Sequence, residues 1–343
     1  MEVLFFYMVS TVLSDYITMF KIQKKKKMIS NKNILILSFF LFVFLGVGCH
    51  RNTKVPETML SGTIKIVADE DLAPLVKSQL DVFQGIYRYA SVKCSYGTEV
   101  EAMDSIIKGK TYMALITRPL SQKELDYFKS KDFFPQSFPI AYDGVAVIVN
   151  PQNKLNIITT QQITQILSGK ITNWSQFEGS GRSESIKLIL DSESSGIIRS
   201  LNDSLHLNQK ISGDYVFAGN SKNVIERIAS EPNGIGFVGY SLLSELESPK
   251  VQETLNTIHV LGVSAAAVAD STNTFKPSLW SLYEKCYPLT RKIYAIYTDP
   301  TSSGLTKGFL SHLTSDRGQL LIYRMGLRPE KDFQRLIKIK NDF

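Results

Sequence analysis

Short apolar runs alternate with amphipathic segments along the chain from Gly62 onward. Apolar runs of about four to eight residues that are rich in β-branched side chains predict strands, and apolar residues three or four positions apart predict helices. The predicted strands cover 63–68, 90–96, 112–118, 142–151, 185–191, 234–240, 258–264 and 290–299. The predicted helices cover 72–87, 99–110, 159–169, 196–205, 221–232, 303–315 and 317–325.

This order predicts an α/β fold with two lobes. Successive strand–helix units give a parallel sheet with helices on its faces. After the strand at 142–151 the pattern starts again, and the strand at 258–264 leads back. We therefore expect mixed, mostly parallel sheets, with two crossover strands that act as a hinge. The predicted lobes are 62–142 with 258–343 for lobe I, and 143–257 for lobe II.

The first 48 residues read as a signal segment. A run of lysines at 24–27 precedes an unbroken apolar stretch, Ile34–Gly48. This stretch is short for a membrane span of about 20 residues but typical of a signal peptide. Small residues then lead into Cys49, which predicts a bacterial lipoprotein with the lipid on Cys49; the alternative is an uncleaved anchor.

Either alternative places the folded part outside the inner membrane, in the cell envelope and facing the periplasm. Residues 49–61 are polar and aperiodic, as expected of a tether between a lipid and a domain. A complete signal sequence begins at Met28, so we expect 1–27 to be an over-extended translation start.

Charge and cysteine content narrow the possible partners. The formal net charge is +7, but residues 1–48 hold six lysines against two acidic residues and account for +4 of it. The remaining 7 − 4 = +3 is too small and too dispersed to predict nucleic-acid binding. In an oxidising envelope Cys94 and Cys286 could form a disulfide, or they could remain thiols in the interior.

The usual signatures of catalysis are missing from the sequence. The four histidines do not pair at metal-ligand spacing, and no nucleophile elbow or glycine-rich nucleotide loop occurs. We therefore predict a binding protein rather than an enzyme, with no cofactor and no metal.

Five loops between strands and helices carry hydroxyl or acidic residues. Each of them alone is explained as a helix cap. We expect the five loops to converge on one cleft between the lobes. Together they predict an anion-binding site, because helix N-termini attract anions. The loops are 68–71, 96–99, 117–118, 191–196 and 219–221.

Several longer motifs then follow one another in a characteristic order. They are LAPL at 72–75, YDGVAVIVNP at 142–151, ILSGKITNW at 166–174, SSG at 194–196, PNGIGFVGY at 232–240, YPLTRKIYAIY at 287–297 and FLSHLTSDRGQLL at 309–321. This series resembles the PstS-like phosphate-binding proteins of ABC importers, which have the periplasmic binding protein type 2 fold.

The resemblance implies a monomer that holds phosphate, or a similar small anion, between its lobes and passes it to an ABC transporter permease. Hydroxyls and backbone N–H groups from both lobes would hold the anion without a metal. Carried over by position, the ligand-binding residues would be Asp71, Thr98, Thr117, Arg118, Ser194, Ser195, Gly196 and Ser221.

Departures from the family pattern leave a second function open. Glu70-Asp71 stands where the family commonly has Ser-Thr, and Asp191 stands where it has an Arg. Arg118 could supply the missing cation, since a guanidinium binds phosphate oxygens bidentately. Asp69 and Glu193 are expected to point outwards and only cap helices. The alternative is a non-transporting envelope sensor or adaptor that has lost or changed its ligand.

Overall fold

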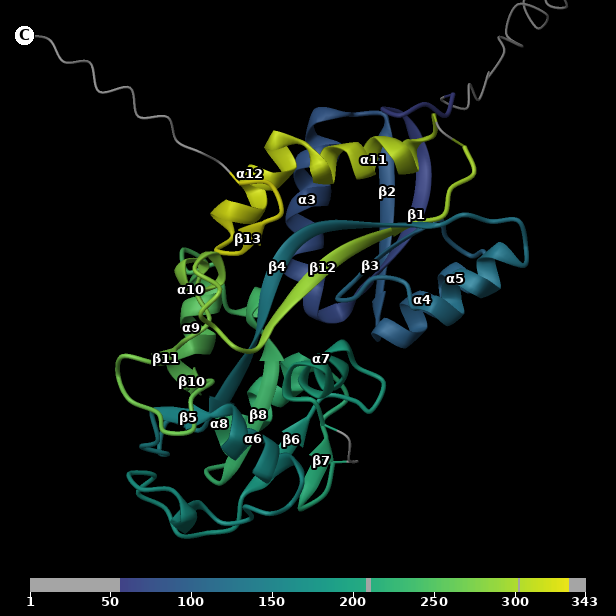
Figure 1. Ribbon diagram of the computed structural model, residues 1–343. Helices are drawn as coiled ribbons and strands as arrows, with labels where there is room; N and C mark the ends of the chain where they lie inside the picture. Colours follow the sequence, from purple (N-terminus) through teal and green to yellow (C-terminus); the bar gives the residue numbers. More distant parts are fainter. Residues whose placement is uncertain (1–55, 208–210, 302, 333–343) are drawn as a thin grey trace, which may run out of the picture. The chain divides into compact units, whose positions relative to one another are not determined.

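The computed structural model describes residues 56–207, 211–301 and 303–332, which form one compact unit (Figure 1). The signal segment and Cys49 lie outside the described residues, so the predictions made for them remain predictions. Among the helices in the described ranges, none is long and apolar enough to cross a lipid bilayer.

The first three strands form a parallel set. β1 (Gly62–Asp69) lies between β2 (Ala90–Gly97) and β3 (Met113–Ile116). Helices α3 (Ala73–Ile86) and α4 (Glu99–Ile107) make the crossover connections, as the alternating pattern predicts. The carboxyl ends of all three strands therefore lie at the same edge of the sheet.

Alternate residues of β1 pack against helices on opposite faces of this sheet. Ile66 and Ala68 are fully buried in the core that holds the apolar side of α3. Val67 between them is buried in a second core with α4. Because side chains of a strand alternate between its two faces, both faces are covered here and Ile66–Ala68 is a continuous apolar run.

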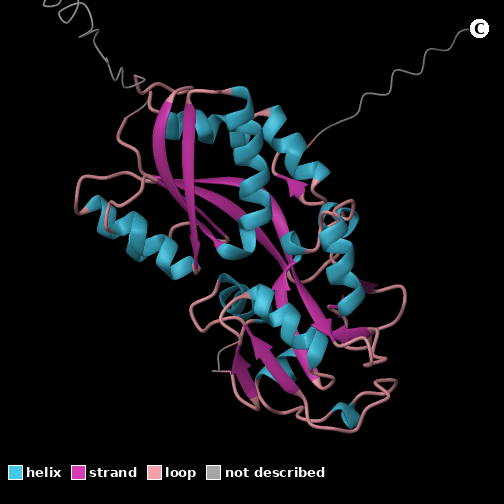
Figure 2. Ribbon diagram, turned by 180° about the vertical axis from the view of Figure 1, so that it is seen from behind, coloured by secondary structure: helices cyan, strands magenta, loops and turns pink. Residues whose placement is uncertain are grey.

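A long strand, β4 (Gln136–Val149), joins the two halves of the main sheet, as Figure 2 shows for the longest magenta strand. Its first half pairs antiparallel with β12 (Thr290–Tyr297) and its second half with β8 (Gly234–Gly239). Beyond β8 lie β6 (Lys187–Leu190) and β7 (Tyr215–Phe217), which are parallel to one another. The strand order is β2-β1-β3-β12-β4-β8-β6-β7. The predicted fold class, a two-lobed α/β protein with mixed sheets, is confirmed.

Helices also cover both faces of the second half of the sheet. The apolar sides of α6 (Thr160–Leu167) and α7 (Gly196–Leu205) share a core with Leu188 of β6. α8 (Ser221–Ser230) packs on the other face, against the next residue of β6, Ile189. The first turn of α7 is thereby held at the carboxyl end of β6.

The strand predicted for 258–264 is wrong as a single element. The chain forms β9 (His259–Val260), which pairs with β4, and then β10 (Gly262–Ser264), which pairs with β5 (Ile157–Thr159). The N–H of Leu261 still donates to β4, whereas the N–H of Gly262 donates to Asn156. The backbone therefore changes partner strands within one residue.

Several short elements escaped prediction because little of their surface is buried. α9 (Pro249–Thr257) buries no residue, and α5 (Gln122–Lys129) buries only Phe128. Both segments hold few apolar residues, and sequence analysis predicted no helix there. The helices α11 (Leu305–Thr314) and α12 (Asp316–Arg324) lie where the sequence predicts them. The remaining elements are η1 (Glu70–Leu72), η2 (Trp174–Gln176), η3 (Tyr240–Leu242), β11 (Thr274–Phe275), α10 (Leu279–Tyr283) and β13 (Arg328–Pro329).

Cys94 and Cys286 are free thiols, and each is partly exposed. Cys94 lies in β2, and Cys286 follows α10. Burial of its sulfur raises the pKa of Cys94 to about 11, so this thiol is a weak nucleophile at neutral pH.

Candidate functional site

The first turn of α7 meets the ends of two strands of the other half of the sheet. A Cβ atom on Gly196 would lie 2.5 Å from Oδ2 of Asp69, which ends β1. It would also lie 2.8 Å from Oγ1 of Thr117, just beyond β3, and 3.2 Å from Oε2 of Glu99, which begins α4. Glycine is needed here because any side chain would collide with these oxygens. The loops at 117–118 and 191–196 therefore converge, as the sequence predicts.

Glu99 lies at the centre of this convergence, with 4% of its side chain exposed. The N–H and the hydroxyl of Thr117 donate to its Oε2 at 3.2 and 2.8 Å. Nε of Arg118 donates to Oε1 at 3.0 Å. Nε and Nη2 of Arg199 donate to Oε1 and Oε2 at 2.7 and 3.2 Å. Burial opposes ionisation, but these donors more than offset it, and the pKa of Glu99 lies below its usual value.

Arg118 is engaged with two carboxylates. Besides Glu99, it makes a bidentate pair with Glu124, with Nη1–Oε2 and Nη2–Oε1 distances of 2.7 and 2.8 Å. The bonds to Glu124, with its negative charge and that of Glu99, raise the pKa of Arg118 against the opposing effect of burial. The cation that sequence analysis selected for an anion is therefore already neutralised within the protein.

Arg199 is a functional candidate that sequence analysis missed. Besides its bonds to Glu99, its Nη2 donates to the carbonyl and hydroxyl of Thr117 at 2.9 and 2.8 Å, and its Nη1 bonds Asp203 at 2.6 Å. Its position gave a usable signal. Arg199 lies four residues after Ser195, the N-cap of α7, and therefore about one turn from the helix N-terminus.

A second group of charges is fully buried below the helix termini. Arg291 of β12 pairs with Asp143 of β4, with Nε–Oδ2 and Nη2–Oδ2 distances of 3.0 and 2.8 Å. Its Nη2 also lies 3.5 Å from Oδ2 of Asp71. Burial raises the pKa of Asp71, while Arg291 and the nearby hydroxyl of Ser221 lower it in part. These ion pairs join β12 to β4 and to the loop after β1, and Ser221 at the N-terminus of α8 lies close to Asp71.

Asp191 also faces the interior. Its Oδ1 accepts a hydrogen bond from the hydroxyl of Ser195 at 2.7 Å, and the same hydroxyl caps α7 by accepting from the N–H of Ile198 at 3.2 Å. Burial, together with the negative charge of Asp71, raises the pKa of Asp191 to about 7. A substantial fraction of this carboxyl is therefore protonated at neutral pH.

The expectation that Asp69 points outwards is wrong. Its side chain is 3% exposed, and one carboxylate oxygen caps η1 by accepting from the N–H of Asp71 at 3.2 Å. Strand alternation gives the reason, because Asp69 shares a face of β1 with the buried Val67. Burial and the charge of Asp71 raise the pKa of Asp69 well above its usual value. Glu193, by contrast, is exposed, as expected.

A family model described as a PBP superfamily domain matches residues 53–317. The chain belongs to the PBP superfamily. This membership confirms the prediction of a periplasmic-type binding protein rather than an enzyme.

Individual relatives of this PBP protein share modest identity over nearly their whole length. The phosphate-binding protein PstS of Borreliella burgdorferi is 23% identical over 310 residues, covering 86% of this chain and 98% of the relative. PstS of Bacillus subtilis is 22% identical over 314 residues, covering 89% and 96%. Among solved structures, a phosphate-bound putative phosphate ABC transporter substrate-binding protein from Clostridium perfringens aligns with a TM-score of 0.67. It is 18% identical, and the alignment covers 79% of this chain and all of that one.

The PBP domain brings most, but not all, of the predicted ligand residues together. Thr117, Arg118, Ser195 and Gly196 surround Glu99 and Asp191, and Asp71 lies beside Ser221. The remaining two predicted residues, Thr98 and Ser194, are next in sequence to Glu99 and Ser195, but their side chains are used or placed differently. Thr98 is half-buried and uses its N–H and hydroxyl in a capping box with Glu101. Ser194 is exposed to solvent.

Buried polar atoms of this region without a hydrogen-bond partner among the residues that the structure describes include Asp69 Oδ2, Asp71 Oδ1, Ser192 Oγ, Ser221 Oγ and Arg291 Nη1. Arg291 Nη2 also has none, although it lies within ion-pair distance of Asp143. Buried polar groups are nearly always hydrogen-bonded, so these atoms are candidates for contacts with a polar ligand. No group of three or more His, Cys, Asp or Glu residues in the described ranges could hold a metal ion.

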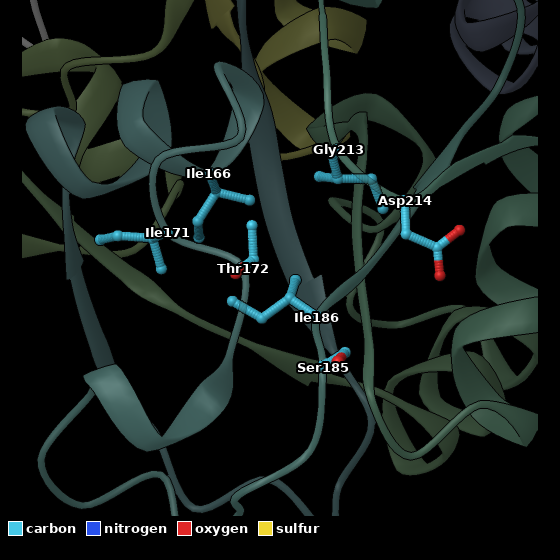
Figure 3. A pocket seen from close by; sticks show the side chains of 8 residues that line it. Ile166, Ile171, Thr172, Ser185, Ile186, Gly213 and Asp214 are labelled. Atoms are coloured by element: carbon cyan, nitrogen blue, oxygen red, sulfur yellow. The ribbon is translucent and has the colours of Figure 1, made fainter.

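A cavity of about 220 Å³ lies elsewhere in the PBP domain, between α6, β6 and the loop before β7 (Figure 3). Isoleucine side chains make up much of its lining, and the carboxylate of Asp214 is directed away from them. None of the predicted ligand residues lines this cavity. The lining residues are Ile166, Ile171, Thr172, Ser185, Ile186, Leu188, Gly213 and Asp214.

Proposed function

We propose that this protein captures phosphate, or a similar small oxyanion, between its two lobes and delivers it to the permease of an ABC importer. One observation carries the proposal: the N-terminus of α7 meets the loops after β1 and β3 at a buried point where the hydroxyl of Thr117 lies beside the carboxylates of Asp69 and Glu99. Helix N-termini and oriented donors of this kind attract anions. The relatives named as phosphate-binding proteins support the choice of ligand.

The proposed ligand set keeps the residues selected from the sequence and adds Arg291. Ser195, Gly196, Thr117 and Ser221 offer hydroxyl or N–H donors, and the remaining members are Asp71, Thr98, Arg118 and Ser194. Arg291 supports the set because its Nη1 atom is buried without a partner in the described chain. A guanidinium is suited to phosphate oxygens by its charge and its planar donors.

Opening and closing of the lobes would admit and release the ligand. In this proposal lobe I comprises 62–142 and 258–343, and lobe II comprises 143–257, with the hinge near Tyr142–Val145 and Ile258–Val260. The continuity of β4 and the position of β9 beside it support a hinge at these two crossings. The protein would act as a monomer, without catalysis and without a cofactor.

The proposed location is the outer side of the inner membrane, where lipid on Cys49 would anchor the protein through the tether. Membrane fractionation tests this. Wild type should partition with membranes, and Cys49→Ser should yield an unprocessed precursor or a soluble protein. Wild type in the soluble fraction would contradict the anchor. Initiation at Met28 further predicts that removal of codons 1–27 changes neither yield nor location.

Ligand binding is tested by calorimetry and by thermal unfolding of the mature protein with phosphate. A bound ligand stabilises by RT ln(1 + [L]/Kd), about 2.7 kcal/mol at a hundredfold excess over Kd. Ser221→Ala should reduce this gain, because the Ser221 hydroxyl is buried beside Asp71. Ser105→Ala, on the exposed side of α4, is the matched control and should keep the gain.

The second candidate is an envelope sensor or adaptor without phosphate transport, and a specific observation favours it. Four carboxylates are buried around the proposed anion-binding point at the N-terminus of α7, which we call the seat. They belong to Asp69, Asp71, Asp191 and Glu99. One misplaced unit charge at 4 Å costs about 4 kcal/mol at an effective dielectric constant near 20. If calorimetry detects no heat of phosphate binding at millimolar phosphate, and the circular dichroism spectrum is that of a folded protein, the importer function is contradicted. The sensor or adaptor function then remains.

A further inference from the structure

The donors around the proposed seat already hold a carboxylate of the protein itself. Thr117, Arg118 and Arg199 direct five hydrogen bonds to Glu99. Two of these three residues, Thr117 and Arg118, belong to the ligand set expected from the sequence. Glu99 accepts hydrogen bonds from two guanidinium groups, one hydroxyl and one backbone N–H. These are the kinds of donor that bind an external oxyanion.

The position of this carboxylate coincides with the anion-attracting end of α7. Oε2 of Glu99 lies 3.2 Å from the place that a Cβ on Gly196 would take, and Gly196 is the first residue of this ten-residue helix. A second carboxylate oxygen, Oδ2 of Asp69, is buried, points at the same glycine and has no hydrogen-bond partner among the described residues. Two independent observations thus mark this point as a polar seat.

We infer that Glu99 is the specificity-determining residue of the seat: its carboxylate takes the position of an external oxyanion, and an anion binds only by displacing it from Arg118 and Arg199. This inference rests on the proposed anion-binding function. The negative charge of Glu99 then sets how strongly an external anion must bind in order to replace the Glu99 carboxylate.

The local charges show why Glu99 is decisive. The two guanidinium groups face three carboxylates, those of Glu99, Glu124 and Asp203. Glu99 has 4% of its side chain exposed and Asp203 has 66%, so solvent screens Asp203 far more. Removal of the Glu99 charge would leave Arg118 paired with Glu124 and would free the charge of Arg199 for a ligand.

The test compares phosphate binding by wild type and Glu99→Gln, both as the mature protein, by calorimetry at pH 7. Removing one like charge from the seat should lower Kd tenfold or more. Glu101→Gln is the matched control: it changes an acidic residue in the same turn, and glutamine can keep the capping box with Thr98. Equal Kd values for wild type and Glu99→Gln would overturn the inference.

The same comparison separates this inference from the proposed function. If wild type binds phosphate and Glu99→Gln binds no more tightly, the importer function stands and the role of Glu99 is refuted. If only Glu99→Gln binds, the role of Glu99 stands and the importer function fails. If neither binds, both fail. Should Glu99→Gln not fold, Glu99→Ala is measured by thermal unfolding; a stabilisation by phosphate no larger than that of wild type would overturn the inference.

Discussion

The Nε atom of Arg199 lies 2.7 Å from Oε1 of Glu99, and this ion pair joins two helices whose paired residues are 100 positions apart in the chain. Glu99 begins α4 and Arg199 lies in the first turns of α7, so the pair connects the two proposed lobes. Both anion-attracting helix ends are thereby joined by a charge pair of the protein itself. An entering anion would compete with a contact that also holds the lobes together.

Loss of this pair should weaken the folded state. Arg199→Ala leaves Glu99 buried, with Arg118 as its remaining ion-pair partner among the described residues. We expect the free energy of unfolding to fall by roughly 2–3 kcal/mol, the cost typical of removing charged hydrogen bonds to a buried group. Urea denaturation measures it. Lys108→Ala, which breaks an exposed pair with Asp104, is the control and should cost about 0.5 kcal/mol or less.

Gly196 should not tolerate even a methyl group. In Gly196→Ala the new Cβ would lie 2.5 Å from Oδ2 of Asp69 and 2.8 Å from Oγ1 of Thr117, so these buried side chains must shift. We expect lower thermal stability and faster hydrogen exchange in the first turn of α7. Gly85→Ala in α3 is the matched control. No atom lies within 4 Å of its added Cβ, and alanine in a helix should stabilise by about 0.5–1 kcal/mol. Equal melting temperatures for the two variants would contradict the close contact.

Stability should fall as the pH rises towards 7. Burial, and then the charge of Asp71, raises the pKa of Asp191 to about 7, whereas an unfolded aspartate releases its proton near 3.8. Between these values the folded state holds a proton that the unfolded state has released. The free energy of unfolding therefore decreases by about 1.4 kcal/mol per pH unit for this group and levels off above its folded pKa. Asp69 and Asp71, whose pKa values are also raised, add to the same trend.

Urea denaturation between pH 5 and pH 8 measures this slope. Asp191→Asn should flatten it and should make the protein more stable than wild type at pH 8, because no charge has to be buried. Asp126→Asn, at an exposed position of α5, should leave the slope unchanged. A slope in Asp191→Asn as steep as in wild type would show that other groups cause it.

The buried pair of Arg291 and Asp143 should be needed for folding stability. Arg291→Met leaves Asp143 and Asp71 without their cation, and breaking a buried pair of this kind costs roughly 3–5 kcal/mol. Lys292→Met, at the next residue of the same strand, breaks a partly exposed pair and should cost about 1 kcal/mol or less. Adding Asp143→Asn to Arg291→Met should recover part of the loss if the unpaired charge is its cause.

The periodicity of the sequence alone determined most of the regular structure. β1, α3, β2, α4 and β3 lie where the alternation of apolar runs and amphipathic segments predicts them. These elements bury most of their apolar residues, and burial is what imposes a period of two or 3.6 residues on a sequence. Local chemistry also determined the caps, since Thr98 and Ser195 stand directly before α4 and α7.

Only the tertiary structure decided which charges meet. Glu99 bonds residues 18, 19 and 100 positions away, and Arg291 bonds one 148 positions away. No local pattern encodes such pairs, because they depend on which strand ends lie at the same edge of the sheet. The burial of Asp69 followed from the same cause. The sequence thus determined that hydroxyl and acidic groups stand at helix N-termini. The packing of the two halves of the sheet decided that the carboxylate of Glu99 meets Thr117, Arg118 and Arg199.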